Sequence, residues 1–328
     1  MKTDNQKIKH LLGIENLKLE DFVLLLENAQ NLVDLSEREI KKAPALRGKT
    51  IINYFAENST RTRTSFEIAG KRLSADTINL SDSTSSANKG ETLLDTARNL
   101  QAMRPDAIVI RHKSSGSPHF LARFLKDTAI INAGDGTHEH PTQALLDCLS
   151  LMQHYNNGIE GIKNKKIAIV GDIIHSRVAR SNIYAHNLLG NQINLVGPRT
   201  LIPYEFKEKF PGNIQIFHNL KEGLKGVDII MCLRLQLERQ SDFYIPSLQE
   251  YTNEFFVSKK ILDEFANKNY IVMHPGPVNR GVEVESYLID SDDSLMTKQV
   301  TNGVAVRMAV LIHCCNRQNK MEEVYAAN

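Results

Sequence analysis

Residues 51–73 read IINYFAENSTRTRTSFEIAGKRL, an apolar run that leads into a turn rich in hydroxyl groups and arginine. The run Ile51–Phe55 predicts a buried strand, and apolar residues with helical spacing from Phe66 to Leu73 predict a helix. Backbone N–H groups at a helix start carry partial positive charge, so the hydroxyls and two guanidiniums of Ser59–Thr64 suit a phosphate or a similar dianion. The simpler alternative is a surface helix with a Ser or Thr cap and two solvated arginines.

Short β-branched runs of the same kind recur along the chain and alternate with amphipathic segments of helical length. The runs are Ile51–Phe55, Asp76–Leu80, Ala107–Ile110, Ala129–Asn132, Ile167–Gly171, Ile193–Gly197, Ile214–Phe217, Val227–Leu233 and Tyr270–His274. This alternation predicts parallel sheets covered by helices on both faces. We therefore expect an α/β protein of two doubly wound domains, each with a parallel sheet of four or five strands flanked by helices, linked by bridging helices.

The chain has 328 residues, which exceeds the usual size of a single core and favours two domains. A polar segment at 155–166, rich in Asn and Gly, indicates the connection between them. We expect a first domain over 1–153 and a second over 154–302, with a C-terminal segment, 303–328, packing back on the first. A bridging helix begins at Pro141, where the missing N–H of proline costs little, and a last helix covers Val304–Cys315.

Composition narrows the class of protein. The 40 basic and 38 acidic side chains leave a net charge of only +2, which argues against a nucleic-acid or membrane surface. The N-terminal residues are polar and lysine-rich, and no run approaches the roughly 20 apolar residues of a membrane span, so we expect a soluble cytoplasmic protein. Four cysteines lie in apolar stretches without paired metal spacing and are expected to be reduced core residues: Cys148, Cys232, Cys314 and Cys315.

Two common nucleotide sites do not fit the sequence. The predicted strand that ends at Gly171 is followed by no further glycine at dinucleotide spacing, so a pyrophosphate could not approach the backbone there. No glycine-rich loop ends in Gly-Lys-Ser or Gly-Lys-Thr, which argues against a P-loop.

A second segment rich in functional groups, Asn132–Gln143 (NAGDGTHEHPTQ), leaves a predicted strand and enters the bridging helix. Strand ends of open α/β sheets form ligand crevices, and a helix start disfavours an imidazolium, so His140 suits a neutral hydrogen-bond donor to a carbonyl oxygen. Gln143, one turn later, faces the same crevice. His138 with His140 is the alternative of a metal site, but no third ligand with convincing spacing accompanies them.

Arginines also follow several predicted strands. Arg111 and His112 follow one strand of the first half, Arg177 lies shortly after a strand of the second half, and Arg234, Gln236, Glu238 and Arg239 follow another. Guanidinium groups at such positions can hold carboxylates in a bidentate manner. Any one of them taken alone is more often a solvated or structural charge, but their recurrence at strand ends in both halves favours anion binding.

These segments together resemble a known family. The turn Ser59–Thr64 with Phe66 and Glu67, the segment Lys89–Thr92, the segment His140–Gln143 and the late segment His274–Pro277 are similar to those of the aspartate/ornithine transcarbamylases. The resemblance spans roughly residues 16–315 and is strongest to the catalytic chains of aspartate carbamoyltransferases.

Ornithine enzymes typically carry His-Cys-Leu-Pro where this chain has His274–Pro277. Lys89, Arg234 and Gln236 also fit a dicarboxylate better than ornithine. Gly276 stands where some relatives carry leucine.

The resemblance implies transfer of the carbamoyl group of carbamoyl phosphate to the α-amino group of L-aspartate, which gives N-carbamoyl-L-aspartate and phosphate in de novo pyrimidine biosynthesis. It implies no metal and no organic cofactor, because positioning and oriented donors suffice for this chemistry. The alternatives are a transcarbamylase for another amino acid such as ornithine, and a non-catalytic relative that binds carbamoyl phosphate.

The resemblance also implies roles for individual residues. The catalytic residues would be Arg61, Thr62, Arg111 and His140. Carbamoyl phosphate would be bound by Ser59, Thr60, Arg61, Thr62, Arg111, His140, Gln143, Pro275 and Gly276. Aspartate would be bound by Lys89, Arg177, Arg234 and Gln236. Ser85 and Lys89 would come from a neighbouring subunit, which implies a homotrimer or a multiple of trimers; a regulatory chain or a dihydroorotase-like partner is compatible with this resemblance.

Overall fold

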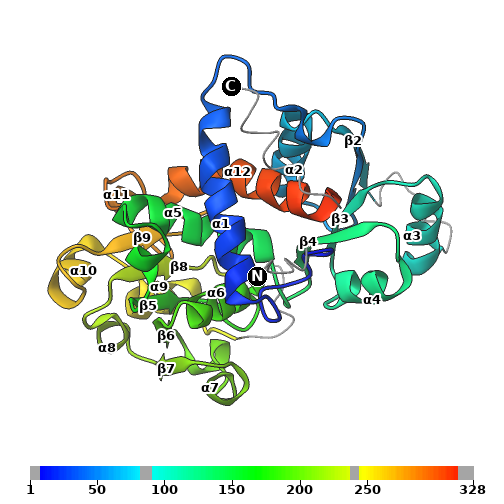
Figure 1. Ribbon diagram of the computed structural model, residues 1–328. Helices are drawn as coiled ribbons and strands as arrows, with labels where there is room; N and C mark the ends of the chain where they lie inside the picture. The colour runs from blue at the N-terminus through cyan, green and yellow to red at the C-terminus, as the bar shows by residue number, and fades with distance from the viewer. Residues whose placement is uncertain (1–7, 82–90, 237–243, 317–328) are drawn as a thin grey trace. The chain divides into compact units, whose positions relative to one another are not determined.

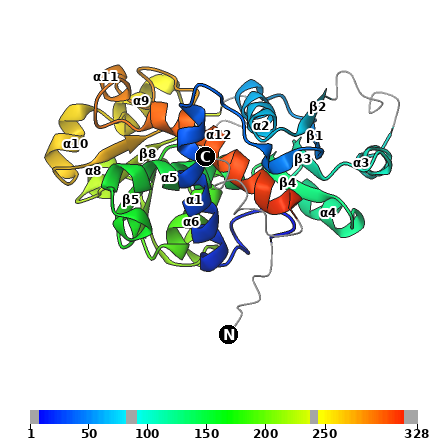
Figure 2. The same ribbon diagram turned by 45° about the horizontal axis from the view of Figure 1, so that its top comes forward.

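The computed structural model describes residues 8–81, 91–236 and 244–316. Within these ranges the chain forms two compact units. Unit 1 comprises the described residues up to Leu146 and from Thr301 onward, and unit 2 comprises Asp147–Val300. Helices α5 (Pro141–Tyr155) and α12 (Met296–Cys315) each contain one of the two points where the chain passes between the units (Figures 1 and 2).

Unit 1 contains a parallel four-stranded sheet in the order β2-β1-β3-β4. Its strands are β1 (Thr50–Phe55), β2 (Asp76–Ser81), β3 (Ala107–His112) and β4 (Ala129–Asp135). The β3–β4 register shifts between Ile110 and His112, which is a bulge at the carboxyl end of the sheet. Because all strands are parallel, the segments that follow them leave from the same edge.

The helices of unit 1 are α1 (Leu19–Val33), α2 (Thr60–Arg72), α3 (Leu93–Ala102) and α4 (Ser117–Phe124), with parts of α5 and α12. Two 3₁₀ turns, Asp34–Ser36 and Pro44–Leu46, precede the sheet. One core joins β1, β3 and β4 to α3 and α4 and contains Ile52, Tyr54, Ala97, Leu100, Ile108, Ile110, Leu121, Leu125 and Ile130. Helix α2 packs closely on the sheet, and Gly70 allows this approach because it has no side chain. A Cβ atom at Gly70 would lie only 2.4 Å from Cγ2 of Thr77.

Unit 2 contains a parallel five-stranded sheet in the order β7-β6-β5-β8-β9. The strands are β5 (Lys166–Val170), β6 (Gln192–Val196), β7 (Asn213–Phe217), β8 (Ile229–Cys232) and β9 (Ile271–Met273). The helices are α6 (Arg177–Leu188), α7 (Phe206–Lys209), α8 (Leu220–Leu224), α9 (Leu248–Phe255), α10 (Lys259–Phe265) and α11 (Ser286–Ile289), with 3₁₀ turns at Gly158–Ile162 and Arg199–Leu201.

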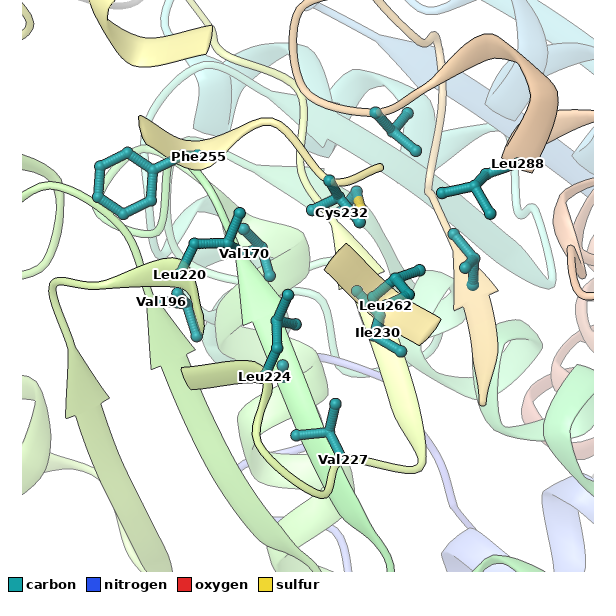
Figure 3. Packing of buried hydrophobic residues seen from close by; sticks show 14 of the residues in the cluster. Val170, Val196, Leu220, Leu224, Val227, Ile230, Cys232, Phe255, Leu262 and Leu288 are labelled. Carbon is teal, nitrogen blue, oxygen red and sulfur yellow. The ribbon is translucent and has the colours of Figure 1, made fainter. Parts of the chain in front are cut away.

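One apolar cluster covers a face of the unit 2 sheet. Val170, Val196, Ile230 and Cys232 come from three neighbouring strands and meet side chains of α8, α9, α10 and α11 (Figure 3). All four of these strand residues are buried. Burying this much aliphatic surface is the main force that holds the helices on the sheet.

The two parallel sheets of four and five strands, flanked by helices, confirm the predicted fold class. Each of the nine predicted runs contains a strand at its expected place. The last helix differs from expectation, because it begins at Met296 rather than Val304 and contains Gly303. A Cβ atom at Gly303 would lie 2.5 Å from Nη1 of Arg307 and 3.4 Å from Leu146. This glycine therefore allows close packing rather than starting the helix.

All four cysteines are buried thiols, as the sequence predicts. Burial raises the pKa of Cys315 to about 12, and the charge of Asp106 adds to this effect. Within the described part of the chain, no helix has both the length and the apolar character needed to cross a membrane.

A buried histidine in α6 predicts an acid-sensitive fold. Burial lowers the pKa of His186 to about 4 from its ordinary 6.5, and Nδ1 of this ring accepts a hydrogen bond from Nδ2 of Asn191 over 2.8 Å. In the unfolded chain the imidazole of His186 binds a proton more tightly than in the folded protein. The free energy of unfolding that is present above pH 6.5 therefore decreases as the pH falls toward 4. From pH 6.5 to about pH 5 we expect a loss of about 2 kcal/mol from this residue.

Urea unfolding at several pH values measures this loss. The His186→Gln variant should show a flatter dependence of the unfolding free energy on pH over this range. Identical slopes in the variant and the wild-type protein would show that another group is responsible.

Candidate active site

Each sheet has one point at which its strand order reverses, and most of the predicted site residues follow the strands on either side of that point or the next strand along. In unit 1 the chain passes from β1 outward to β2 and then returns to β3 on the other side of β1. In unit 2 the corresponding reversal lies between β5 and β8. The segments after such a pair of strands diverge and leave a crevice in which open α/β sheets bind ligands. Each unit therefore has its own candidate ligand crevice, after β1 and β3 in unit 1 and after β5 and β8 in unit 2.

The turn after β1 enters α2 directly. Ser59 is the N-cap residue in extended conformation, and its side chain makes no capping hydrogen bond. The first helical hydrogen bond runs from N–H of Arg63 to the carbonyl of Ser59, so Thr60, Arg61 and Thr62 form the positive first turn. Thr62 is buried, whereas Arg61 is exposed. The hydroxyl of Ser59 and this first turn therefore suit an anion better than a simple helix cap.

Arg111, near the end of β3, lies beside this turn. Its backbone carbonyl accepts N–H groups of Ala56 and Glu57, over 2.9 and 3.3 Å. Its Nη2 atom lies 2.7 Å from Oε1 of Glu57, and its Nη1 atom donates to the carbonyl of Ala133 over 3.3 Å. Little of either ionic side chain is exposed, at 12% and 22%. Glu57 therefore holds the guanidinium of Arg111 across the reversal point of unit 1.

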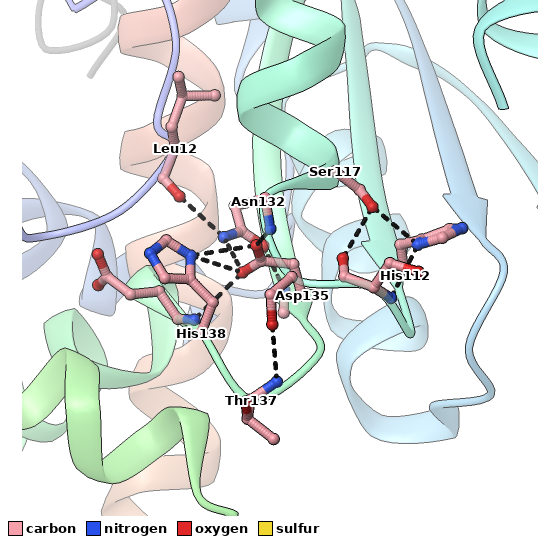
Figure 4. Close-up of polar contacts among 12 residues, drawn as sticks. Leu12, His112, Ser117, Asn132, Asp135, Thr137 and His138 are labelled. Carbon is pink, nitrogen blue, oxygen red and sulfur yellow. Dashed lines mark hydrogen bonds and ion pairs between the residues drawn. The ribbon is translucent and has the colours of Figure 1, made fainter.

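A buried carboxylate, Asp135, organises the segment after β4 (Figure 4). Its Oδ1 atom accepts hydrogen bonds from Nδ2 of Asn132 and N–H of Glu139, over 2.8 and 3.1 Å. Its Oδ2 atom accepts N–H of Gly116, over 2.6 Å, and lies 3.1 Å from Nδ1 of His138. Burial raises the pKa of Asp135, but the hydrogen bonds of His138 and Asn132 outweigh this effect, so the pKa lies below its usual value.

This organised segment delivers His140 to the start of α5. The carbonyl of His140 accepts N–H of Gln143 over 2.9 Å, and Pro141 is the first helical residue. His140, Thr142 and Gln143 are all buried. The imidazole and the amide thus lie one helical turn apart at the positive end of α5, as expected for groups that orient a polar ligand.

In unit 2 a second buried carboxylate, Asp172, joins the segments after β5 and β8. Its Oδ1 atom lies 2.8 Å from Nδ1 of His175, and its Oδ2 atom accepts N–H of Gln236 over 3.3 Å. The amide of Gln236 also donates to the carbonyl of His175 over 3.3 Å. Gln236 is therefore fixed at the reversal point of unit 2.

The two predicted arginines of unit 2 belong to the same two segments. Arg177 is the first residue of α6 and is buried, and the hydroxyl of Ser176 caps this helix by accepting N–H of Ala179 over 3.1 Å. Arg234 is half-buried and lies two residues after β8. Two cations and one amide at one sheet edge suit a ligand with more than one carboxylate.

Pro275 and Gly276 follow β9 in a turn held by His274. Nδ1 of His274 accepts N–H of Gly276 over 2.8 Å, so the ring proton lies on Nε2, which is 3.3 Å from Oε1 of Glu283. The same Oε1 atom accepts N–H of Asn279 over 2.6 Å. Gly276 has φ +61°, a left-handed conformation that glycine adopts without penalty. This backbone explains the glycine at a position where leucine would be strained.

The predicted residues belong to both units. Unit 1 contains Ser59, Thr60, Arg61, Thr62, Arg111, His140 and Gln143, and unit 2 contains Arg177, Arg234, Gln236, Pro275 and Gly276. Ser85, Lys89, Glu238 and Arg239 lie outside the described residues. Sequence reasoning missed three acids that position these groups, Glu57, Asp135 and Asp172. Each of these acids lies at the end of a strand or within two residues after it, next to a polar turn. An acidic residue at such a position was the feature of the sequence that could have identified them.

Two family models match the chain. The carbamoyl-P binding domain of aspartate/ornithine carbamoyltransferases matches residues 9–153, and the Asp/Orn binding domain of the same enzymes matches residues 163–314.

Curated relatives are similar over most of their length. The chain is 54% identical over 309 residues to the aspartate carbamoyltransferase catalytic subunit of Magnetococcus marinus. The aligned residues cover 94% of this chain and 93% of the relative. The corresponding subunit of Geobacter sulfurreducens is 52% identical, over 94% of this chain and 96% of the relative.

Solved structures share the fold. Aspartate transcarbamoylase from Trypanosoma cruzi, in complex with carbamoyl phosphate and aspartate, has a TM-score of 0.82 at 29% identity, and the match covers 94% of this chain and 97% of the solved chain. Ornithine carbamoyltransferase from Pyrococcus furiosus has a TM-score of 0.81 at 28% identity, covering 92% and 96%.

Proposed function

The chain belongs to the aspartate/ornithine carbamoyltransferase family, and we propose that it is an aspartate carbamoyltransferase. It transfers the carbamoyl group of carbamoyl phosphate to the α-amino group of L-aspartate and releases N-carbamoyl-L-aspartate and phosphate. This reaction is a step of de novo pyrimidine biosynthesis.

The choice of aspartate as acceptor rests on the sheet edge of unit 2. Arg177, Arg234 and Gln236 belong to segments that the carboxylate of Asp172 and the carbonyl of His175 draw together. Two guanidiniums can each take one carboxylate of aspartate in a bidentate manner. Ornithine has a second ammonium group in place of the second carboxylate, and two arginines would repel it.

Carbamoyl phosphate is a dianion whose carbonyl carbon must become more electrophilic. Ser59, Thr60, Arg61 and Thr62 hold the phosphate at the positive start of α2, and Arg61 stabilises the charge that grows as phosphate leaves. Thr62, Arg111 and His140 donate to the carbonyl oxygen. Gln143 and the carbonyl of Pro275 bind the carbamoyl nitrogen, with Gly276 beside them.

The amino group of aspartate attacks the carbonyl carbon and forms a C–N bond. The resulting tetrahedral intermediate collapses as the carbon–oxygen bond to phosphate breaks, and the electron pair of that bond leaves with the phosphate. The attacking amine loses one proton, and the departing phosphate accepts it. The protein contributes positioning and charge stabilisation and forms no covalent bond with either substrate.

Each of the two domains binds one of the two substrates. We assign residues 1–153 with 303–328 to the binding of carbamoyl phosphate and residues 154–302 to the binding of aspartate; the two compact units divide nearby within the same helices, at Leu146 and Thr301. Ser85 and Lys89 act in the site of a neighbouring subunit, with Lys89 also binding aspartate, so the enzyme is a cytoplasmic homotrimer or a multiple of trimers. A regulatory chain or a dihydroorotase-like partner is compatible with this assembly.

The acceptor is tested by an assay with both amino acids. With carbamoyl phosphate and L-aspartate, the purified protein should release N-carbamoyl-L-aspartate and phosphate in equal amounts, and L-ornithine should give neither. Product identity is read by mass spectrometry and phosphate by a colorimetric assay. Turnover with ornithine but not aspartate would overturn the proposal, and tight binding of a bisubstrate phosphonate without turnover would favour a non-catalytic relative.

The shared site is tested by subunit hybrids. Lys89→Ala and His140→Ala chains should each be nearly inactive. A shared site is native when its His140 comes from one chain type and its Lys89 from the other. An equal mixture of the two chains, dissociated and reassembled, should therefore recover about a quarter of the wild-type activity. Confirmed hybrids that stay inactive would argue against sharing.

A further inference from the structure

Two imidazoles and one carboxylate converge in unit 1, beside the segment that leads from β4 to His140. His119 comes from α4, whereas Asp135 ends β4 and His138 follows it by three residues. Each residue offers a ligand atom, and these atoms lie within 4.8 Å of one another. The sequence pairs His138 with His140, but the fold instead brings His119 and Asp135 to His138.

The donor set matches a particular class of metal ion. Imidazole nitrogen and a carboxylate oxygen are ligands of Zn²⁺, and three protein ligands leave a position for water. We propose that His119, Asp135 and His138 bind a divalent transition-metal ion of the zinc class. This site goes beyond the carbamoyl transfer reaction, which needs no metal.

The carboxylate of the site is already oriented by its neighbours. Asp135 accepts hydrogen bonds from Asn132, Gly116 and Glu139, so its position is fixed by the backbone on both sides (Figure 4). Hydrogen bonds of this kind set the direction of a ligand and strengthen metal binding. The site is thus built on a rigid oxygen donor rather than on a flexible surface acid.

The two histidine rings lie close together and are partly exposed, so a cation from solvent can reach them. Their rings meet edge to face, with centroids 5.4 Å apart. The side chain of His138 is 27% exposed and His119 is half-buried, so solvent reaches the cluster.

An ion pair between His138 and Asp135 is the simpler role for this cluster. The hydrogen bond to Asp135 raises the pKa of His138, in agreement with such a pair. An ion pair, however, does not involve His119, whose ring meets that of His138 edge to face with centroids 5.4 Å apart. A divalent ion would use both rings, and the carboxylates of Glu15 and Glu139, which have oxygen atoms within 4.8 Å of a ring nitrogen of His138, add negative charge beside it.

Metal binding by the purified full-length protein tests this site. After treatment with a chelator, the protein is dialysed against Zn²⁺, and Co²⁺ is added separately as a spectroscopic probe. We expect one Zn²⁺ per chain and visible Co²⁺ absorption bands stronger than those of the hydrated ion. His119→Ala and His138→Ala should each weaken Zn²⁺ binding by at least about tenfold and abolish the Co²⁺ bands.

The control is His154→Ala, because His154 is an exposed histidine of α5 in unit 2. This variant should bind Zn²⁺ like the wild-type protein. Circular dichroism checks that each variant is folded, and if one site variant fails to fold the other decides. Absence of Zn²⁺ binding in the wild-type protein, or equal binding by both site variants, would overturn the proposal whatever the carbamoyl transfer activity.

Discussion

Replacing Arg61 with alanine should lower kcat about 100- to 1000-fold and leave the free energy of unfolding nearly unchanged. Arg61 lies in the first turn of α2 with an exposed side chain, so its removal leaves no cavity in the core. Its guanidinium is assigned to the charge that develops on the leaving phosphate. An interaction that strengthens only in the transition state affects kcat more than substrate binding.

Steady-state kinetics with carbamoyl phosphate and aspartate measure this effect. Lys71→Ala is the matched control, because Lys71 is an exposed cation of the same helix that pairs with Glu67 over 2.6 Å. The control variant should retain wild-type kcat. A variant Arg61→Ala with normal kcat and only a raised KM would show that Arg61 binds the ground state and does not act on the leaving group.

Replacing Asp135 with alanine should lower the free energy of unfolding by roughly 3–5 kcal/mol. The carboxylate is buried, and its loss would leave the N–H groups of Gly116 and Glu139, the amide of Asn132 and the ring of His138 without their acceptor. A buried hydrogen-bond donor without an acceptor lowers the free energy of unfolding by far more than a typical surface interaction raises it. Activity should fall as well, since this network positions His140.

Urea denaturation at neutral pH gives the stability change. Asp135→Asn should lose less than Asp135→Ala, because the amide oxygen can still accept some of these hydrogen bonds. Asp76→Ala, at an exposed position of β2, should change stability by no more than about 0.5 kcal/mol. An Asp135→Ala protein as stable as the Asp76→Ala control would mean that the segment after β4 is held by other contacts.

The prediction from sequence succeeded where signals were local. The β-branched runs predicted nine strands that the described structure contains, because most of these strands are buried and therefore short and apolar. The more exposed strands, β2 and β7, each lie at one end of their sheet. The start of α2 after Ser59 and of α5 at Pro141 were equally readable from hydroxyl and proline positions. The prediction from Gly303 was wrong, because this glycine lies inside α12, where its missing side chain leaves room for Arg307 one helical turn later and for Leu146, which is distant in sequence.

The supporting acids could not be identified in the same way. Glu57 and Arg111 are separated by 54 residues and meet only because β1 and β3 are neighbours in the sheet. Asp172 and Gln236 are separated by 64 residues and meet because β5 and β8 are neighbours. Strand order decides such pairs, and hydrophobic periodicity does not encode it.

The sequence by itself determined the family and the parallel α/β class, because turn chemistry and apolar periodicity are properties of adjacent residues. The residues that it assigns to the two anionic substrates stay a prediction. The tertiary structure alone decided which acids hold those residues and which histidine accompanies His138. From the sequence, the only pairing considered for His138 was His140, and it was set aside because no third ligand accompanied it, whereas the fold brings His119 of α4 and Asp135 to His138. The physical reason is that side chains far apart in the chain meet only where the order of strands and the packing of helices bring them together.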